Sequence, residues 1–273
     1  MDTEKVPSAI TKVAATKFES GASHQTLESV ITEEPLEIRV ATSHGEDRIA
    51  VTMRTPGNDL ELAAGFVLGE GVVSSVAEIT KVVVCGDRSL TPRQRANVVI
   101  VHSAHAQVPT RLLDRRFVIS SACGVCGVSS IAELQERIPE KAVPSSMAEE
   151  DLISAIALLK PEQKLFEKTG GLHAAGIFLP EKNSVHWVRE DVGRHNAVDK
   201  SIGAAALGNS SIVGGTLLFS GRIGFEIVQK AAMARLSAIV GVSAPTSMAI
   251  DTGRSAGITI IGFAREGRGT RYC

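Results

Sequence analysis

The stretch TLLFSGRIGFEIVQKAAMARLSAIVGVSAPTSMAIDTGRSAGITIIGFA, residues 216–264, decides the fold of this chain. In it, short runs rich in Leu, Ile and Val alternate with longer segments whose apolar residues recur at helical spacing. The pattern predicts strands at 216–220, 238–243 and 258–264, with helices at 222–235 and 246–254 between them. Strands joined by helices through short links form parallel sheets with right-handed crossovers, so we expect an α/β fold here.

The predicted sheet has one edge at which polar and glycine-rich segments follow the strands. These segments are residues 220–222, 243–246 and 263–268. Ligands of open α/β sheets bind outside the carboxyl ends of the strands, and helix N-termini at that edge favour anions. Arg222, Arg265 and Arg268 add guanidinium groups, which suit phosphate. One such segment alone is best interpreted as an ordinary turn with a solvated arginine, but the three together predict an anionic ligand such as a nucleoside diphosphate.

A smaller region precedes this domain in the sequence. Apolar and polar residues alternate at 35–43 and 48–55 on either side of a polar turn, which predicts a β-hairpin. Asn58 or Asp59 can cap a helix that follows. We therefore expect a flexible arm at 1–25, a smaller α+β region at 26–140 and the α/β domain at 141–273. Further strands are predicted at 79–84, 96–101, 173–179 and 184–189, and further helices at 128–138, 149–160 and 194–207.

Composition excludes several classes of protein. The 273 residues are 44% hydrophobic and 22% charged, as in globular proteins, which excludes extended disorder and collagen-like repeats. The chain has 29 Lys and Arg residues against 30 Asp and Glu residues. It therefore lacks the excess of basic residues that is typical of proteins that bind nucleic acid or an anionic membrane surface. The chain shows neither a secretory signal nor an apolar run of about 18 residues, so we expect a cytoplasmic protein.

The sharpest chemical feature is the thiol pair Cys123-Gly124-Val125-Cys126. Four cysteines in the whole chain are too few for a disulfide scaffold, and cytoplasmic thiols stay reduced. Serine, glycine and alanine surround the pair, whereas an inert buried cysteine packs among larger hydrophobic residues. The motif therefore indicates reactive thiols.

Three kinds of chemistry stay open for this pair. A zinc ribbon needs a second C-x-x-C, and a nucleobase deaminase needs H-x-E together with P-C-x-x-C; neither is complete here, although His173 or His195 could complete a zinc site. A thiol-disulfide oxidoreductase would place the pair between a strand at 117–120 and the helix at 128–138. In sulfur carriage, a cysteine takes the outer sulfur of a persulfide and passes it to an acceptor.

Two histidines lie in segments dense in polar or small residues. His173 follows two glycines at the start of a predicted strand, and His195 lies in EDVGRHNAVDK, residues 190–200, where Asp191 can cap the next helix. A lone histidine is more often structural than catalytic. Either one could lower the pKa of a nearby thiol or form a hydrogen bond with a ligand, but the sequence pairs neither with Cys123.

Taken together, these segments resemble the FdhD-type formate dehydrogenase accessory proteins. The resemblance covers most of the chain apart from the N-terminal arm and the last few residues. No single motif is specific, but their order and number argue against chance. The matching motifs are NDLELAAGFVLGEG (58–71), SACGVCG (121–127), TGGLHAA (169–175), EDVGRHNAVDK (190–200), SGR (220–222), SAPT (243–246) and GFAREGR (262–268).

The resemblance implies a function and a fold. Proteins of this family are cytoplasmic sulfur carriers that form dimers. They accept persulfide sulfur from a cysteine desulfurase and deliver it to the molybdenum (or tungsten) bis-guanine-dinucleotide pterin cofactor, before that cofactor enters formate dehydrogenase. The implied fold is a cytidine-deaminase-like three-layer α/β/α domain with a second, smaller α+β domain, and GDP is an expected mimic of the cofactor.

The resemblance also implies roles for particular residues. Cys123 carries the persulfide and Cys126 is its partner. The cofactor-binding loop is Phe263, Ala264, Arg265, Glu266, Gly267 and Arg268, the same loop that the strand-edge argument reaches. We add to this site the neighbouring candidates Ser220, Arg222, His173 and His195.

Overall fold

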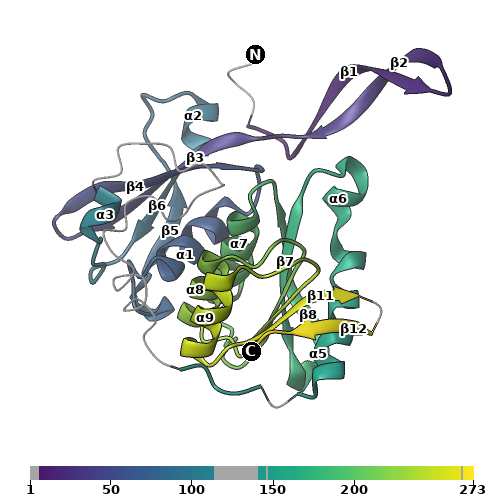
Figure 1. Cartoon of the computed structure of the whole chain (residues 1–273). Coiled ribbons are helices and arrows are strands. Elements are labelled where there is room, and N and C mark those ends of the chain that lie inside the picture. The colour runs from purple at the N-terminus through teal and green to yellow at the C-terminus, as the bar shows by residue number, and fades with distance from the viewer. Residues whose placement is uncertain (1–5, 114–140, 146, 266) are drawn as a thin grey trace.

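The computed structural model describes residues 6–113, 141–145, 147–265 and 267–273, and its larger part is built on a six-stranded sheet (Figure 1). The strands are β7 (His173–Leu179), β8 (Ser184–Asp191), β9 (Thr216–Phe219), β10 (Ala238–Gly241), β11 (Thr259–Arg265) and β12 (Arg268–Arg271). They lie in the order β12-β11-β10-β9-β7-β8. The three strands predicted from residues 216–264 are parallel neighbours, as expected, whereas β7, β8 and β12 add antiparallel pairs on either side.

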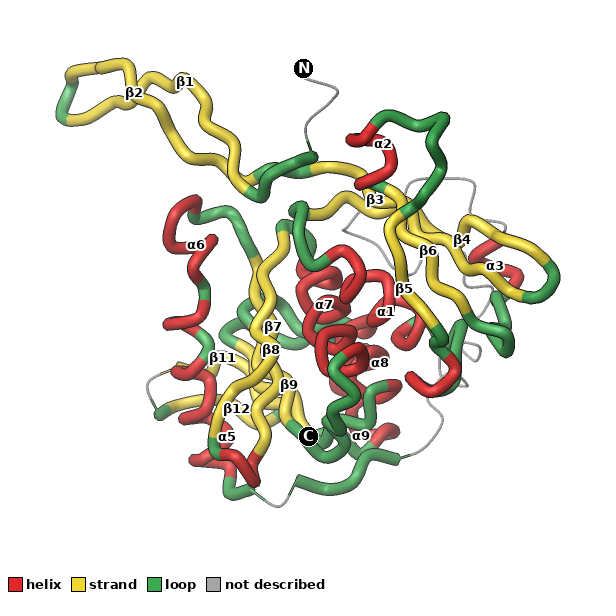
Figure 2. The backbone as a smooth tube through the Cα atoms, turned by 180° about the vertical axis from the view of Figure 1, so that it is seen from behind, coloured by secondary structure: helices red, strands yellow, loops and turns green. Residues whose placement is uncertain are grey.

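Helices pack against both faces of this sheet (Figure 2). Successive strand residues point to opposite faces, so Leu217 and Phe219 join one buried cluster and Leu218 the other. One face of the sheet carries α7 (Arg194–Leu207), α8 (Phe225–Met233) and α9 (Ser247–Ala256). The other face carries α5 (Glu149–Ala155) and the 3-10 helix η2 (Ile156–Leu158). The next elements in the chain are η3 (Lys160–Glu162) and α6 (Lys164–Thr169), and η4 (Pro180–Lys182) lies in the turn between β7 and β8. No helix within the described residues is long and apolar enough to cross a membrane.

A four-stranded sheet forms the smaller part of the molecule. The predicted hairpin is present as β3 (Glu34–Thr42) and β4 (Gly45–Arg54), and the sheet order is β4-β3-β6-β5. Buried residues of β3, β4 and β6 pack against α1 in one apolar cluster. The other elements are α1 (Asp59–Gly69), η1 (Val76–Glu78), β5 (Lys81–Val84), α2 (Pro92–Ala96), β6 (Val98–His102) and α3 (Thr110–Leu113). Asn58 holds the N-cap position of α1 in a left-handed conformation and makes no side-chain cap bond, and Asp59 in the first turn pairs with Arg54.

The two parts meet where α1 lies across α7. A Cβ atom added to Gly65 of α1 would lie 1.9 Å from the carbonyl oxygen of Asp199, and one added to Gly203 of α7 would lie 1.8 Å from that of Glu61. Only glycine permits this approach of the two backbones. Because of this contact, residues from both parts of the chain position the start of α7 and the loop before it.

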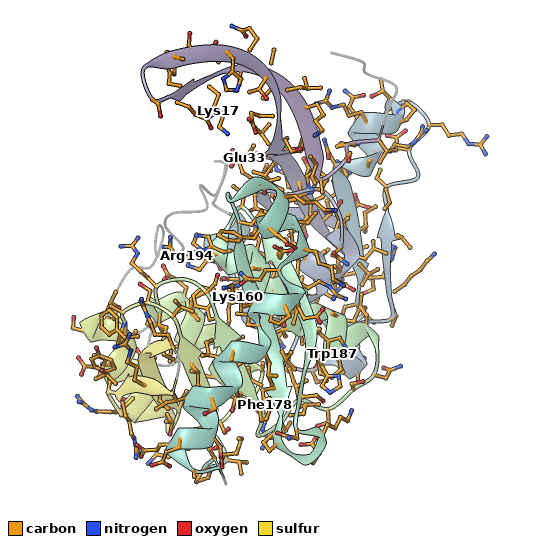
Figure 3. The ribbon with its side chains drawn as sticks, turned by 90° about the vertical axis from the view of Figure 1, so that its right-hand side faces the viewer. Lys17, Glu33, Lys160, Phe178, Trp187 and Arg194 are labelled. Atoms are coloured by element: carbon orange, nitrogen blue, oxygen red, sulfur yellow. The ribbon has the colours of Figure 1, made fainter. Side chains whose placement is uncertain are left out.

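The N-terminal segment forms a hairpin, β1 (Ile10–Glu19) with β2 (Ala22–Ile31), which projects from the body (Figures 1 and 2). Regular strands thus occupy much of the segment for which the polar composition predicts a loose arm. Figure 3 shows Lys17 on this arm and Glu33 at its base. The predicted division at residue 140, the predicted helix at 128–138 and the cysteine pair lie outside the described residues.

Candidate functional site

The three predicted strand ends meet at one edge of the large sheet. After β9, the amide of Ile223 donates to the carbonyl oxygen of Ala244 (3.1 Å), and the amide of Thr246 donates back to Ile223 (3.0 Å). Near the end of β11, the amide of Phe263 donates to the carbonyl oxygen of Ser243 (3.3 Å), which follows β10. The predicted convergence of the segments at 220–222, 243–246 and 263–268 is therefore confirmed for the residues described.

Of the two helices at this edge, α8 begins later than the spacing predicts, whereas α9 begins where the spacing predicts it. Helix α8 begins at Phe225 after the N-cap Gly224, so Arg222 lies exposed in the loop and not on the helix. Helix α9 follows Thr246, whose hydroxyl accepts a hydrogen bond from the amide of Ala249 (3.3 Å). Both helices direct their N-terminal amides toward the edge, which favours negative charge there.

His173 and Ser220 line this edge from β7 and the end of β9. The hydroxyl of Ser220 accepts a hydrogen bond from the amide of Ala174 (2.8 Å), which ties the loop to β7. His173 Nδ1 lies so close to Gly221 that a Cβ added there would be 3.2 Å from it. Burial and, next, the charge of Arg194 lower the pKa of His173 below its ordinary value, so the ring is neutral near pH 7.

A cavity of about 1260 Å³ opens at this edge, between the sheet and the segment 156–171. Four of the predicted site residues line it: His173, Ser220, Ala264 and Arg265. Apolar side chains from η2 and α6, together with Leu172 and Val242, form other parts of the wall. The volume exceeds the range of about 300–1,000 Å³ typical of small-molecule sites, so the cavity has room for a large ligand.

The segment 263–268, predicted as a loop, is largely strand, because Phe263 and Arg265 lie at the end of β11 and Arg268 begins β12. Phe263 is 46% exposed and has a φ of 53°, a left-handed conformation that is strained for a bulky residue. Arg265 and Arg268 are directly opposite each other in the β11–β12 pair, and both are exposed. Like charges in that position repel, and an anion bound between them would relieve this repulsion. Glu266 lies outside the described residues, as do Cys123 and Cys126.

His195 pairs with a residue that sequence spacing does not connect to it. Its Nε2 lies 3.6 Å from Oε2 of Glu226. This contact joins the first turn of α7 to the first turn of α8. The polar contact with His195 is the largest cause that lowers the pKa of Glu226, to about 2, against the opposing effect of burial. His195 thus faces a carboxylate near the sheet edge and is not among the residues that line the cavity.

The His195–Glu226 contact predicts a pH dependence. A carboxyl with a lowered pKa stabilises the folded protein above its ordinary pKa, and this contribution is lost as the pH falls toward about 2. We expect Glu226→Gln to lower the free energy of unfolding by about 1–2 kcal/mol at pH 7, allowing for solvent screening, and by almost nothing near pH 2. Urea unfolding at several pH values measures this, with exposed Glu181→Gln as control. A difference that stays constant with pH would contradict it.

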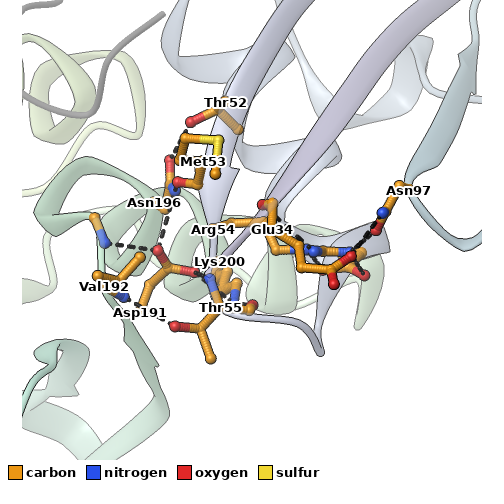
Figure 4. A network of polar contacts seen from close by, with 12 residues as sticks. Glu34, Thr52, Met53, Arg54, Thr55, Asn97, Asp191, Val192, Asn196 and Lys200 are labelled. Atoms are coloured by element: carbon orange, nitrogen blue, oxygen red, sulfur yellow. Dashed lines mark hydrogen bonds and ion pairs between the residues drawn. The ribbon is translucent and has the colours of Figure 1, made fainter. Parts of the chain in front are cut away.

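Behind the edge lies a buried polar network that holds the start of α7 (Figure 4). The sequence predicts Asp191 as a helix cap, but the N-cap is Gly193, and Asp191 is fully buried. Its Oδ1 accepts from the amide of Gly193 (2.7 Å) and from Asn196 Nδ2 (3.0 Å). Its Oδ2 accepts from the amide of Thr55 (3.1 Å) and lies 2.7 Å from Lys200 Nζ. Asp191 therefore joins β8 and α7 to the smaller sheet.

A second buried ion pair continues this network. Lys230 Nζ of α8 lies 2.7 Å from Asp199 Oδ1 of α7 and 3.7 Å from Glu70 Oε1, which follows α1. Burial raises the pKa of Asp199 to about 6, against the opposing pull of the Lys230 ammonium. The sequence places Asp199 and Lys200 on a helix but contains no signal of their burial.

The described residues contain no group of three or more His, Cys, Asp or Glu side chains arranged to hold a metal ion.

Comparisons with known proteins agree with the resemblance. A "Sulfur carrier protein FdhD" of Anaeromyxobacter sp. (strain K) is 45% identical over 258 residues, covering 90% of this chain and 86% of the relative. A protein of the same name from Streptomyces avermitilis is 40% identical over 254 residues, covering 91% and 88%. A crystal structure of a putative formate dehydrogenase accessory protein from Desulfotalea psychrophila superposes with a TM-score of 0.73 at 21% identity, covering 97% of both chains.

The match to the family is as broad as the match to these relatives. The model of the FdhD/NarQ family matches residues 31–273, from the base of the arm to the last residue. That range contains every strand of both larger sheets, the strand-edge site and the CGVC motif. The chain belongs to the FdhD/NarQ family, whose relatives at this similarity are sulfur carrier proteins.

Proposed function

We propose that this protein accepts persulfide sulfur from a cysteine desulfurase on Cys123 and transfers it to the molybdenum (or tungsten) bis-guanine-dinucleotide pterin cofactor. The transfer precedes insertion of that cofactor into formate dehydrogenase apoenzyme, whose activity depends on it. The reaction takes place in the cytoplasm, where thiols stay reduced. The observation that carries the proposal is the CGVC motif in a chain that belongs to a family of sulfur carriers.

The loading step is a thiol exchange. The thiolate of Cys123 attacks the outer sulfur of the donor persulfide, a new S–S bond forms, and the donor cysteine leaves as a thiolate. At delivery, the thiolate of Cys126 attacks the inner sulfur on Cys123, a Cys123–Cys126 disulfide forms, and the outer sulfur leaves as sulfide to the acceptor. Low-molecular-weight thiols of the cytoplasm then reduce the disulfide and are themselves oxidised, which restores both thiols for the next cycle.

The strand-edge cavity supports a guanine-nucleotide site. Arg265 and Ser220 line it, and Arg222 and Arg268 follow strands at the same edge, where the free amides of α8 and α9 also favour phosphate. The exposed ring of Phe263 gives a guanine base a surface on which to stack. His173, neutral at pH 7, offers one donor and one acceptor. In a homodimer, two such sites hold the two nucleotide halves of the cofactor. As a separate part of this proposal, the larger domain has a cytidine-deaminase-like fold.

Intact-mass measurement after incubation with a cysteine desulfurase and cysteine tests the sulfur-carrier function. The parent protein is expected to gain about 32 Da, one sulfur atom, with the modification on Cys123. The double variant Cys123→Ala, Cys126→Ala is expected to gain none, while Cys85→Ala serves as the control that still gains it. Full sulfur addition to the double variant would contradict the proposal.

The alternatives give different results in related assays. A thiol-disulfide oxidoreductase reduces insulin and loses two hydrogens on oxidation without sulfur addition. A zinc-binding, deaminase-like protein contains stoichiometric zinc. A chaperone keeps its full biological activity without either cysteine of the pair. The family membership and the names of the relatives favour sulfur carriage over these three.

A further inference from the structure

The cavity at the strand edge has two walls of different chemistry. On the sheet side, Arg265 supplies a positive charge, and the neutral His173 supplies one donor and one acceptor. On the other side, the segment 156–171 adds an aromatic ring, Phe166, and a carboxylate, Glu167, from consecutive positions of α6. A carboxylate repels phosphate, so Glu167 cannot serve the anion that the sheet edge favours. The two walls therefore suit different parts of one ligand.

Glu190 of β8 holds α6 against the sheet. Its Oε2 accepts a hydrogen bond from the amide of Leu165 (2.8 Å), and its Oε1 accepts one from the amide of Phe166 (2.7 Å). Glu190 is directly opposite Ala174 of β7, so both bonds tie the first turn of α6 to two paired strands. The backbone that carries the aromatic ring and the carboxylate is therefore fixed relative to the strand edge.

The side chains of Phe166 and Glu167 are available to a ligand. Phe166 lines the cavity and is 43% exposed. Among the described residues, no ion pair or hydrogen bond engages the carboxylate of Glu167. Lys164 pairs with Glu162 instead, and Lys160 of the same segment (Figure 3) does not contact it. An aromatic face stacks on a flat heterocycle, and a carboxylate only accepts hydrogen bonds, so this wall suits a heterocycle whose edge donates them.

A guanine base presents such an edge. Its ring N1–H and its 2-amino group are adjacent donors, which the two oxygens of one carboxylate can accept side by side. Adenine instead presents an acceptor, N1, beside its amino group, and that acceptor repels a carboxylate. We propose that α6 reads the base in this cavity: Phe166 stacks on one face of the guanine and leaves the other for Phe263, Glu167 accepts from N1–H and the 2-amino group, and Glu190 positions both. The proposal rests on the nucleotide site of the proposed function and adds the residues that select its base.

Calorimetry of the full chain with GDP, ADP and inorganic pyrophosphate tests this. The wild type is expected to bind GDP at least about 10-fold more tightly than ADP. Glu167→Gln is expected to weaken GDP binding about 10- to 100-fold and to leave pyrophosphate, which has no base, unchanged. ADP binding is expected not to weaken, because an amide can donate to N1 and accept from the amino group of adenine. Glu162→Gln, outside the cavity lining, is the matched control and is expected to keep all three affinities.

Two further variants separate stacking from positioning. Phe166→Leu keeps an apolar side chain but removes the ring, so it is expected to weaken GDP and ADP by the same factor of about 10. Glu190→Gln leaves one amide of α6 facing an N–H group, so it is expected to weaken GDP and to reduce the preference for GDP over ADP, with pyrophosphate unchanged. A merely structural role of Glu190 would lower the melting temperature and leave that preference as it is.

The outcomes distinguish this assignment from the proposed function. A preference for GDP over ADP that is unchanged in Glu167→Gln would overturn the base reading and leave the nucleotide site in place. An equal loss of GDP and pyrophosphate affinity in that variant, or a wild type without the preference, would do the same. A wild type that binds neither nucleotide would overturn the nucleotide site, and the base reading with it. Sulfur addition to Cys123 is measured by mass and is independent of these results.

Discussion

Lys200→Met is expected to lower the free energy of unfolding by about 3–5 kcal/mol, because it leaves the buried carboxylate of Asp191 without its cation. Both side chains are 1% exposed or less, so water cannot replace the lost partner. The same ammonium also donates to the carbonyl oxygen of Thr55 (2.8 Å), which links α7 to the smaller sheet. Removing it therefore leaves a buried charge and a buried carbonyl unpaired at one point.

Urea unfolding followed by circular dichroism measures this change, and Lys164→Met is the matched control. The Lys164–Glu162 pair spans 3.9 Å with both side chains at least half exposed, so its loss is expected to change the free energy of unfolding by less than about 0.5 kcal/mol. The double variant Asp191→Asn, Lys200→Met removes both charges and is expected to recover part of the lost stability. A loss below about 1 kcal/mol in Lys200→Met would contradict the view that this ion pair holds the two parts together.

The network also bears on the site, because Asp191 positions the loop from which Arg194 and His195 extend. Its contacts to the amide of Gly193 and to Asn196 fix the first turn of α7 from inside the protein. Thr52 and Met53 of β4 hold Asn196 from the other sheet. The ligand edge of the large sheet is thus anchored on the small one, although every predicted ligand contact lies on the large one.

The centre of the large sheet could be predicted because its local signals agree with one another. In residues 216–264, apolar runs of strand length alternate with segments of helical period, and short links leave parallel pairing as the natural arrangement. The convergence of three loops at one edge follows from that topology alone. The sequence pattern also predicts the helix at 194–207 with the bounds that the structure shows.

Long-range pairing and burial of charge could not be predicted in this way. Asp199 and Lys200 are adjacent charges of a kind usually found on a solvated helix face, but α7 lies between α1 and the sheet, so both are buried. Glu226 meets His195 only because α7 and α8 begin side by side. The β1–β2 arm escaped prediction because its apolar positions are too sparse in a polar segment to mark two strands. In each case the deciding contact lies outside the local window that a periodicity measures.

Arg265 and Arg268 form a pair at the end of the large sheet, and their loss is expected to have a large effect on nucleotide affinity. Arg265→Ala, Arg268→Ala is expected to weaken binding of GDP, measured by calorimetry, about 100- to 1,000-fold, since each guanidinium supplies charge-assisted hydrogen bonds to phosphate. The two side chains are directly opposite in the β11–β12 pair, so their mutual repulsion is a cost that a bound anion relieves. The double variant is therefore expected to melt no lower than the wild type, which separates lost binding from lost folding. Arg254→Ala, at an arginine already paired with Asp251, is the control expected to keep its affinity. Unchanged affinity in the double variant would remove this loop from the nucleotide site.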